Sequence, residues 1–383
     1  MESHAKSSGT EWSSLFTDGE DVSRRLGFGT MLFGEYTSES EAFELLDRSM
    51  EHGLRLLDTA EMYPVPQGAH SQGLSERIVG SWLRSRHAGG LVSREEIILS
   101  SKVTGPSGQM PWIRGGPNKV DKRAITEAVE GSLARLDTDY LDVYHIHWPD
   151  RYVPMFGEAL YDSRRRLHYS VPLEEQMEAM QTLVYQGKVR RVGLSNETPW
   201  GLMRCCELHR SEPNKYPRIS CVQQAYSLLC RGFEEQGGLA ECCAEEDVKL
   251  LAYSPLAMGL LTGKYLVKGE KEGLGDHGPR EARLNLYRGK YSEAEQRYER
   301  TLRVQEACQY YVALARECGM SAVELAIRFV LSQGEGRGCC CIVGATSTDQ
   351  LDALAAAAKK GKLPEEVLSR IETVYRKYGS PTP

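Results

Sequence analysis

Short apolar runs typical of β-strands alternate with amphipathic helical stretches from residue 24 onward, and this alternation constrains the fold more than any other feature of the sequence. Strands separated by helices pair in parallel through right-handed crossovers, and eight strand–helix units in a row favour one closed barrel over two lobes. The sequence therefore predicts an α/β protein built as a single (β/α)8 TIM barrel. Its strands are expected at residues 26–31, 54–58, 97–102, 141–147, 189–195, 221–225, 249–253 and 340–343.

Helical periodicity fills the intervals between these runs. The first helix should open at Ser38, because Glu41 follows it at the spacing of a capping box. Helices are expected at residues 38–52, 74–85, 122–136, 173–186 and 324–331. Together with the strands they leave no linker that would divide residues 24–383, which we predict to be one domain that includes a C-terminal helix.

Two predicted loops are larger than the others and leave from the carboxyl ends of strands four and seven. They cover residues 148–171 and 258–292. In a barrel, insertions at this edge shape a site rather than stabilise the fold. The second loop is rich in glycine, lysine and arginine, which suits a basic flap over a phosphorylated ligand, although an ordinary solvated loop explains the same composition equally well.

Charge and cysteine usage limit the class of partner and the compartment. The 47 Lys and Arg against 53 Asp and Glu give a net charge of −6, which provides no general attraction to nucleic acid or to an anionic membrane, so we expect a small-molecule partner. The eleven cysteines include adjacent pairs and no C-x-x-C motif, which favours reduced thiols and a cytoplasmic location. Residues 1–23 are expected to form a flexible tail without a secretory signal, and a trimmed organellar targeting segment is an alternative. The oligomeric state is not indicated.

Ionisable side chains stand at the ends of consecutive predicted strands. Asp58 ends the second strand, Lys102 the third and His147 the fourth, while Tyr63 follows on the loop after the second. A buried lysine needs a carboxylate partner, and Asp58 is the nearest candidate. The Lys102 charge should lower the pKa of Tyr63 and make it a usable general acid, with His147 donating to the same substrate oxygen. This arrangement suits carbonyl reduction, which requires a nicotinamide or flavin because no side chain supplies a hydride.

Seven motifs in order, mostly at strand ends, resemble the aldo-keto reductase family, and most closely its Tas-like branch of NADP(H)-dependent members. They are DTAEMYPVP at 58–66, QGLSE at 72–76, SKVTGPS at 101–107, HWPD at 147–150, GLSNE at 193–197, YSPLAMGLLTGKY at 253–265 and GATSTDQL at 344–351. The resemblance implies NADPH-dependent reduction of aldehydes or ketones to alcohols, without a metal. It also implies a catalytic tetrad of Asp58, Tyr63, Lys102 and His147.

The same resemblance implies a set of cofactor-binding residues along the barrel mouth. Ser195, Asn196 and Gln223 would hold the nicotinamide carboxamide, Tyr253 would stack on its ring, Ser254, Leu256, Met258 and Lys264 would follow the pyrophosphate, Arg283 would reach the 2′-phosphate, and Gly344, Thr346 and Gln350 would lie toward the adenosine end.

The segment that begins at Gly344 also has a physical reason to bind phosphate. It leads from a predicted strand into a helix whose first turn offers unpaired backbone N–H groups, although simple capping by Ser347 or Thr348 is the alternative. One departure concerns adenine, because Ala353 and Leu354 stand where many relatives carry a Glu-Asn pair. The preference for NADPH over NADH therefore depends on fewer contacts than usual.

Two other functions compete with this hypothesis. His145 and His147 are two apart in a predicted strand and so face the same side, a geometry that can hold zinc in a barrel hydrolase. Neighbouring strand ends offer few further ligands, however, and His145 is more readily explained as a packed barrel residue. The second alternative is a cofactor-binding regulatory subunit of a larger assembly, which would bind NADPH with little or no turnover. The physiological carbonyl substrate is not indicated by the sequence.

Overall fold

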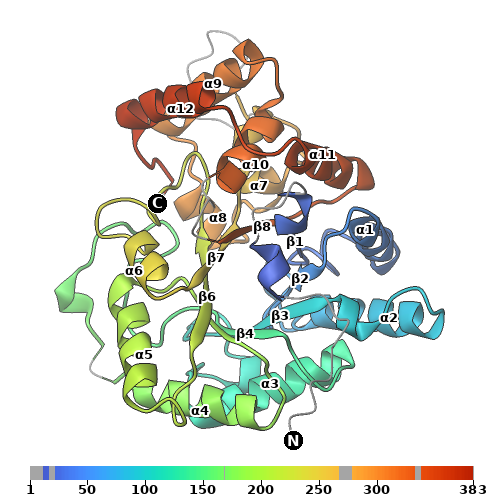
Figure 1. Ribbon diagram of the computed structural model, residues 1–383, viewed down its shortest axis with the longest axis vertical. Coiled ribbons are helices and arrows are strands. Elements are labelled where there is room, and N and C mark those ends of the chain that lie inside the picture. Colours follow the sequence, from blue (N-terminus) through green and yellow to red (C-terminus); the bar gives the residue numbers. More distant parts are fainter. Residues whose placement is uncertain (1–11, 17–21, 168, 267–277, 333–337, 383) are drawn as a thin grey trace, which may run out of the picture.

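The protein folds as a closed barrel of parallel strands surrounded by helices. The computed structural model describes residues 12–16, 22–167, 169–266, 278–332 and 338–382. Within these ranges, eight strands pair in sequence order and β8 pairs with β1, which confirms the predicted (β/α)8 barrel (Figure 1). The strands are β1 (Leu26–Gly29), β2 (Leu56–Asp58), β3 (Ile98–Val103), β4 (Val143–Ile146), β5 (Val192–Ser195), β6 (Ile219–Ala225), β7 (Lys249–Tyr253) and β8 (Cys339–Val343).

Several strands are shorter than the apolar runs that predicted them. Leu54, Leu141 and Val189 are buried but precede their strands, and Leu141 and Val189 form only an isolated bridge. An apolar side chain marks burial, not ladder pairing, so the runs extended the prediction into the adjoining turns. At the other end, His147 lies just beyond β4.

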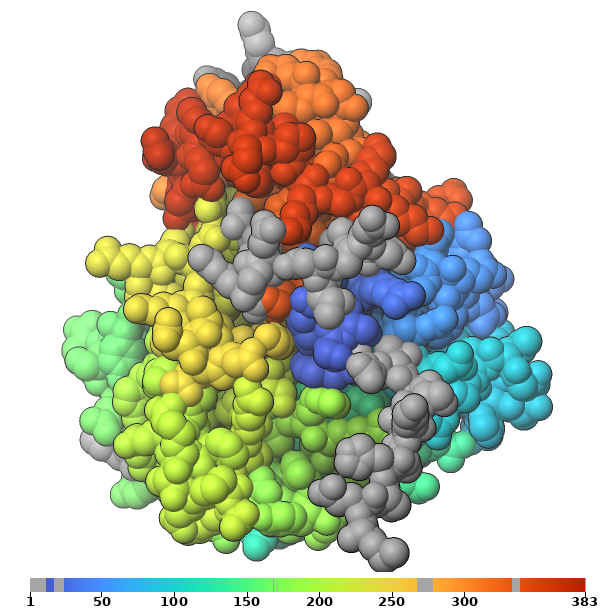
Figure 2. Space-filling view, in the orientation of Figure 1, coloured from blue at the N-terminus to red at the C-terminus, as the bar shows by residue number. Residues whose placement is uncertain are grey.

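The helices form a ring outside the strands and an additional group near the C-terminus. The capping box of α1 is present, since Ser38 N donates to Glu41 Oε2 at 2.8 Å and Ser38 caps the helix. Figure 1 places α9 and α12 next to each other at one side of the barrel, and in Figure 2 these orange and red segments form the upper part of the molecule. The helices are α1 (Glu39–Glu51), α2 (Leu74–Ala88), α3 (Lys122–Leu136), α4 (Leu173–Tyr185), α5 (Pro199–Ser211), α6 (Ala240–Glu245), α7 (Arg283–Leu286), α8 (Ser292–Arg297), α9 (Leu302–Glu317), α10 (Ala322–Ser332), α11 (Thr348–Lys359) and α12 (Glu365–Tyr378).

A short segment near the N-terminus packs against the barrel interior. The 3-10 helix Trp12–Leu15 places Leu15 at 1% exposure against a cluster of inward-facing side chains that includes Leu56, Ile98 and Leu251. The prediction of a flexible tail is wrong for this helix. The apolar side chain of Leu15 is buried against the inward-facing side chains of the barrel, and this burial favours an ordered segment. Residues 1–11 and 17–21 of the predicted tail lie outside the described residues, and the domain boundary at residue 24 stays a prediction.

His145 fills the barrel interior, where Gly193 leaves room for it. Its Nδ1 lies 3.4 Å from Ser100 Oγ and its Nε2 3.4 Å from Cys221 Sγ. Burial lowers its pKa to about 4, so the ring is neutral at physiological pH. A group of three or more His, Cys, Asp or Glu side chains suited to a metal ion is not found in the described ranges. His145 therefore has the role of a packed interior residue.

We expect Gly193→Ala to destabilise the barrel by about 1–3 kcal/mol, the usual effect of overpacking a core. A Cβ atom there would lie 2.4 Å from His145 Cδ2 and 2.8 Å from Cys221 Sγ, and both side chains are fully buried. Urea unfolding would measure the change. Gly232→Ala is the matched control, because a Cβ at Gly232 meets no atom within 4 Å. Equal unfolding midpoints for the two variants would contradict the expectation.

Two further observations concern the chain as a whole. All eleven cysteines lie in the described ranges, and each is a free thiol. Among the helices that can be described, none combines the length and the apolar character needed to cross a membrane.

Candidate active site

A cavity of about 780 Å³ opens at the carboxyl ends of the barrel strands. This is within the range of small-molecule and cofactor sites. Its wall combines the ends of β2, β5, β6, β7 and β8 with parts of the two long loops and with the first turn of α11. The cavity thus lies where barrel enzymes keep their active sites.

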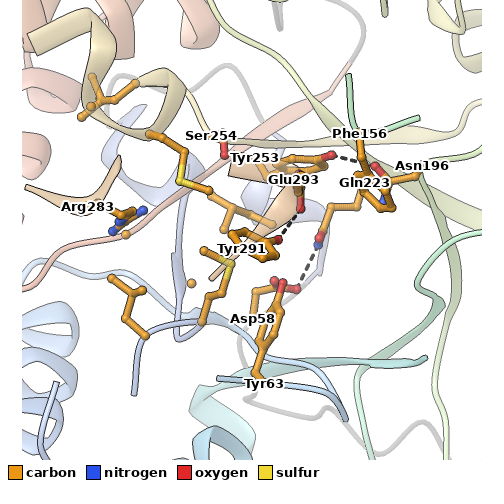
Figure 3. A pocket seen from close by; sticks show the side chains of 18 of the residues that line it. Asp58, Tyr63, Phe156, Asn196, Gln223, Tyr253, Ser254, Arg283, Tyr291 and Glu293 are labelled. Carbon is orange, nitrogen blue, oxygen red and sulfur yellow. Dashed lines mark hydrogen bonds between the residues drawn. The ribbon is translucent and has the colours of Figure 1, made fainter. Parts of the chain in front are cut away.

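Asp58 and Lys102 form a buried ion pair at the base of the cavity. Lys102 Nζ donates to Asp58 Oδ2 and to the carbonyl oxygen of Thr59, each at 2.7 Å. The other carboxylate oxygen of Asp58 accepts from Ser100 Oγ at 2.7 Å and from Gln223 Nε2 at 2.9 Å (Figure 3). Lys102 is fully buried behind the cavity wall, and burial lowers its pKa while Asp58 opposes that shift. The predicted pairing of the two residues is therefore present.

Tyr63 lies on the cavity wall near this pair. Its ring centroid is 5.2 Å from Lys102 Nζ and 5.7 Å from the ring of His147. The pKa of Tyr63 is raised well above its ordinary value, first by burial and then by the negative charges of Asp58 and Glu293. The expectation that Lys102 lowers this pKa is wrong, because the ammonium is already paired with Asp58 and burial dominates. The phenol consequently keeps its proton at neutral pH.

His147 lines the cavity as a neutral imidazole. Its pKa is well below the ordinary value because of burial and the positive charge of Lys102. The Nδ1 atom is buried and has no hydrogen-bond partner within the described part of the chain. Since a buried N–H without an acceptor costs more than a buried lone pair without a donor, the tautomer with its proton on Nε2 is favoured.

The predicted cofactor residues come together in the same cavity. All twelve contribute to its lining, and with Asp58, Tyr63 and His147 they form a continuous wall from the barrel centre to α11. They are Ser195, Asn196, Gln223, Tyr253, Ser254, Leu256, Met258, Lys264, Arg283, Gly344, Thr346 and Gln350. The structure thus brings all twelve to one cavity, and their roles toward a cofactor stay predictions.

Two cations converge at the end of the cavity away from Tyr63. Burial, and then the positive charge of Arg283, lower the pKa of Lys264. A Cβ added to Gly344 would lie 3.7 Å from Arg283 Nη2, so this guanidinium faces the end of β8. Neither cation forms an ion pair with any residue that the structure describes. Two neighbouring positive charges that are not paired with a carboxylate suit a phosphorylated ligand.

The start of α11 is already capped by its own side chains. Ser347 is the N-cap and accepts from Gln350 N at 3.3 Å, while Gln350 Oε1 accepts from Thr346 N at 3.1 Å. The capping that was the alternative explanation for this segment is therefore present. Contacts to a phosphate here would come from Gly344 and from the two cations, Lys264 and Arg283. Ala353 and Leu354 also line this end of the cavity with apolar side chains.

The backbone is strained at three of the predicted cofactor residues. Asn196 has φ 53°, Ser254 φ 56° and Met258 φ 55°, all in the left-handed region that non-glycine residues rarely adopt. Asn196 and Ser254 follow directly from β5 and β7, and all three residues line the cavity. Such strain commonly gathers at functional sites, where the surrounding structure holds it in place.

The short helix α8 supplies cavity residues that the sequence did not predict. Glu293 accepts from the hydroxyl of Tyr291 and lies on the wall between Asp58 and Tyr253 (Figure 3). Arg297 forms an ion pair with Glu293 at 3.1 Å and donates to Tyr253 Oη at 2.7 Å. The i,i+4 spacing of Glu293 and Arg297 is visible in the sequence, but it is equally typical of a solvent-exposed helix.

Comparison with known proteins agrees with this geometry. Residues 25–376 match the model of the Aldo/keto reductase family. The chain is 40% identical over 358 residues to "Protein tas" of Escherichia coli (strain K12), covering 94% of this chain and 96% of that protein. It is 46% identical over 179 residues to the "Aldo-keto reductase" of Babesia bovis, covering 45% and 62%.

A solved structure is also similar. The crystal structure of an aldo-keto reductase from Klebsiella pneumoniae in complex with NADPH matches with a TM-score of 0.60 and 26% identity, over 94% of this chain and 92% of that one. The family model spans the whole barrel, and the match with "Protein tas" covers nearly the entire chain. This protein therefore belongs to the aldo/keto reductase family.

Proposed function

We propose that the protein is an NADPH-dependent oxidoreductase that reduces aldehydes or ketones to alcohols, with Tyr63 as the general acid. The observation that carries the proposal is a single cavity with a protonated phenol and a neutral imidazole at one end and two cations at the other. A dinucleotide with a phosphorylated ribose has the matching chemistry. The complex of the Klebsiella pneumoniae relative with NADPH supports the assignment.

The proposed mechanism of carbonyl reduction follows from the protonation states of the cavity residues. When bound, NADPH would supply a hydride to the carbonyl carbon of the substrate. Tyr63 keeps its proton at neutral pH and can donate it to the carbonyl oxygen, while Lys102, 5.2 Å from the ring, places a positive charge beside the phenolate that results. His147 would orient the same oxygen through a hydrogen bond from Nε2. Asp58 holds the Lys102 ammonium in position.

Apolar side chains in the cavity lining support one kind of carbonyl compound. Trp148, Val153, Met155, Phe156 and Met110 line the cavity beside His147. A neutral aldehyde or ketone with an aromatic or branched apolar group fits this lining better than a small charged one. We also propose a reducing, cytoplasmic location, which the eleven free thiols support.

Turnover of a panel of aldehydes, ketones and quinones with NADPH and with NADH tests the proposed function. Trp148 lies in the cavity, so quenching of tryptophan fluorescence by NADPH would report binding in the same samples. We expect quenching together with repeated turnover of an aromatic aldehyde such as 4-nitrobenzaldehyde. Quenching without turnover of any compound in the panel would favour the alternative, a cofactor-binding regulatory subunit.

We expect Arg283→Ala to weaken binding of NADPH by about 10- to 100-fold and binding of NADH much less. A guanidinium contact to phosphate is charge-assisted and contributes about 1.5–3 kcal/mol, and only NADPH carries the 2′-phosphate. Titration calorimetry with both cofactors measures the difference. Arg280→Ala is the control, since Arg280 lies on the same segment outside the cavity lining. Equal losses for both cofactors would show that Arg283 does not contact the 2′-phosphate.

A further inference from the structure

A chain of hydrogen bonds connects α8 to the backbone of His147. Arg297 Nη1 donates to Tyr253 Oη at 2.7 Å. Tyr253 Oη in turn donates to Asn196 Oδ1 at 2.6 Å (Figure 3). Asn196 Nδ2 in turn donates to the carbonyl oxygen of His147 at 2.9 Å and to Ser195 Oγ at 3.1 Å. The chain therefore runs from an inserted helix, through the end of β7 and the end of β5, to the end of β4.

Arg297 also contacts the long loop that follows β4. It is 6% exposed, and its guanidinium carbon lies 5.5 Å from the centroid of the Phe156 ring. Phe156 packs edge-on against Trp148 at 5.9 Å. The loop after β4 is pressed against α8 at this point, because a Cβ at Gly157 would lie 3.0 Å from Arg297 N. Arg297 thus packs between α8 and the loop that follows β4.

The ion pair with Glu293 is not sufficient to explain why Arg297 is buried next to Tyr253. A buried guanidinium needs its charge balanced, and Glu293 at 3.1 Å does so. The same Nη1 atom makes a shorter bond, at 2.7 Å, to a tyrosine hydroxyl. A tyrosine ring whose hydroxyl is held by two partners has lost its rotational freedom before a ligand arrives, which lowers the entropic cost of stacking on that ring.

We propose that Arg297 is a positioning residue that fixes the Tyr253 ring for stacking on nicotinamide and, through Asn196, fixes the carboxamide side of the same subsite. The inference rests on the proposed function, since it takes Tyr253 and Asn196 to face the nicotinamide. It extends that function by assigning a role to a residue of α8, which lies beyond the strand-end motifs. Arg297 acts only through other side chains and does not touch the reacting atoms.

The test compares a complete cofactor with a fragment that lacks nicotinamide. NADPH and adenosine 2′,5′-bisphosphate are titrated calorimetrically into the parent protein and into Arg297→Met, Arg297→Lys and Tyr253→Phe. Because a hydrogen bond from a charged donor is lost, we expect Arg297→Met to bind NADPH about tenfold more weakly or worse, with the fragment unchanged within about twofold. Arg297→Lys keeps a charged donor and should fall between parent and Arg297→Met.

Two further variants separate positioning from a general structural effect. Tyr253→Phe removes the receiving hydroxyl without changing any charge, so it should produce the same selective loss, and adding Arg297→Met to it should cost little more. Arg328→Met is the control, because Arg328 is also a mostly buried arginine paired with a glutamate, Glu324, but lies on α10 outside the cavity lining. It should bind both ligands as the parent does.

Equal weakening of NADPH and the fragment in Arg297→Met, or an unchanged NADPH affinity in Tyr253→Phe, overturns the inference. If the parent protein itself binds neither ligand, the proposed function falls and this inference falls with it. Binding of the two ligands to the parent protein therefore distinguishes a failure of the proposed function from a failure of this inference.

Discussion

Tyr63→Phe is expected to lower kcat for aldehyde reduction by about 10²- to 10⁴-fold or more, because general acid catalysis typically contributes a factor in this range. The substitution removes only the proton-bearing hydroxyl and keeps the ring, which packs 5.7 Å from the ring of His147. The affinity for NADPH should stay within a few-fold of the parent, because Tyr63 lies at the opposite end of the cavity from Lys264 and Arg283. Steady-state kinetics and a fluorescence titration of NADPH measure the two quantities.

The outcome depends on where the proton comes from. A variant that retains most of the parental kcat would assign proton donation to another group, with His147 as the first candidate. His147→Gln would then show the larger loss of the two. With Tyr63 as the donor, adding His147→Gln to Tyr63→Phe should change kcat by much less than the product of the single effects, because the residues act on one oxygen.

Lys102→Met is expected to cost both activity and stability, and the two losses can be separated. The variant leaves the Asp58 carboxylate buried without its cation, and breaking a buried ion pair in this way costs about 3–5 kcal/mol. It also removes the positive charge beside the phenolate, so kcat should fall to a similar extent as in Tyr63→Phe. Urea unfolding and aldehyde turnover provide the two measurements.

Asp58→Asn combined with Lys102→Met is the matched control for that prediction. The amide of asparagine is neutral and can still accept from Ser100 Oγ and Gln223 Nε2, the two donors of Asp58 Oδ1. Much of the lost stability should return in the double variant, while the activity should not. Recovery of activity along with stability would show that Lys102 serves only to neutralise Asp58.

Residues at strand ends were predictable because the barrel period determines where they point. Asp58, Lys102 and His147 follow consecutive apolar runs, and the closed order of the strands brings them to one mouth. The capping box at Ser38 was equally accessible, since it depends on local spacing alone. For such residues, neighbouring positions in the sequence contain the required information.

Residues placed by long-range packing were not predictable in the same way. Leu15 comes from a segment with the composition of a tail, yet its side chain packs into the barrel interior. Glu293 and Arg297 show helical spacing, but only the packing of the inserted segment turns them toward Tyr253. The pKa of Tyr63 was predicted with the wrong sign, because the sequence indicated a nearby lysine but not the depth of burial.

The most direct measurement follows the hydride itself. The protein is incubated with 4-nitrobenzaldehyde and NADPH in which both hydrogens at C4 of the nicotinamide are replaced by deuterium, and the 4-nitrobenzyl alcohol is analysed by mass spectrometry and NMR. The proposed function predicts one deuterium on the carbinol carbon of each alcohol molecule, formed in step with NADPH oxidation and over many turnovers. Alcohol without deuterium at that carbon, or NADPH that binds and is never oxidised, would contradict it.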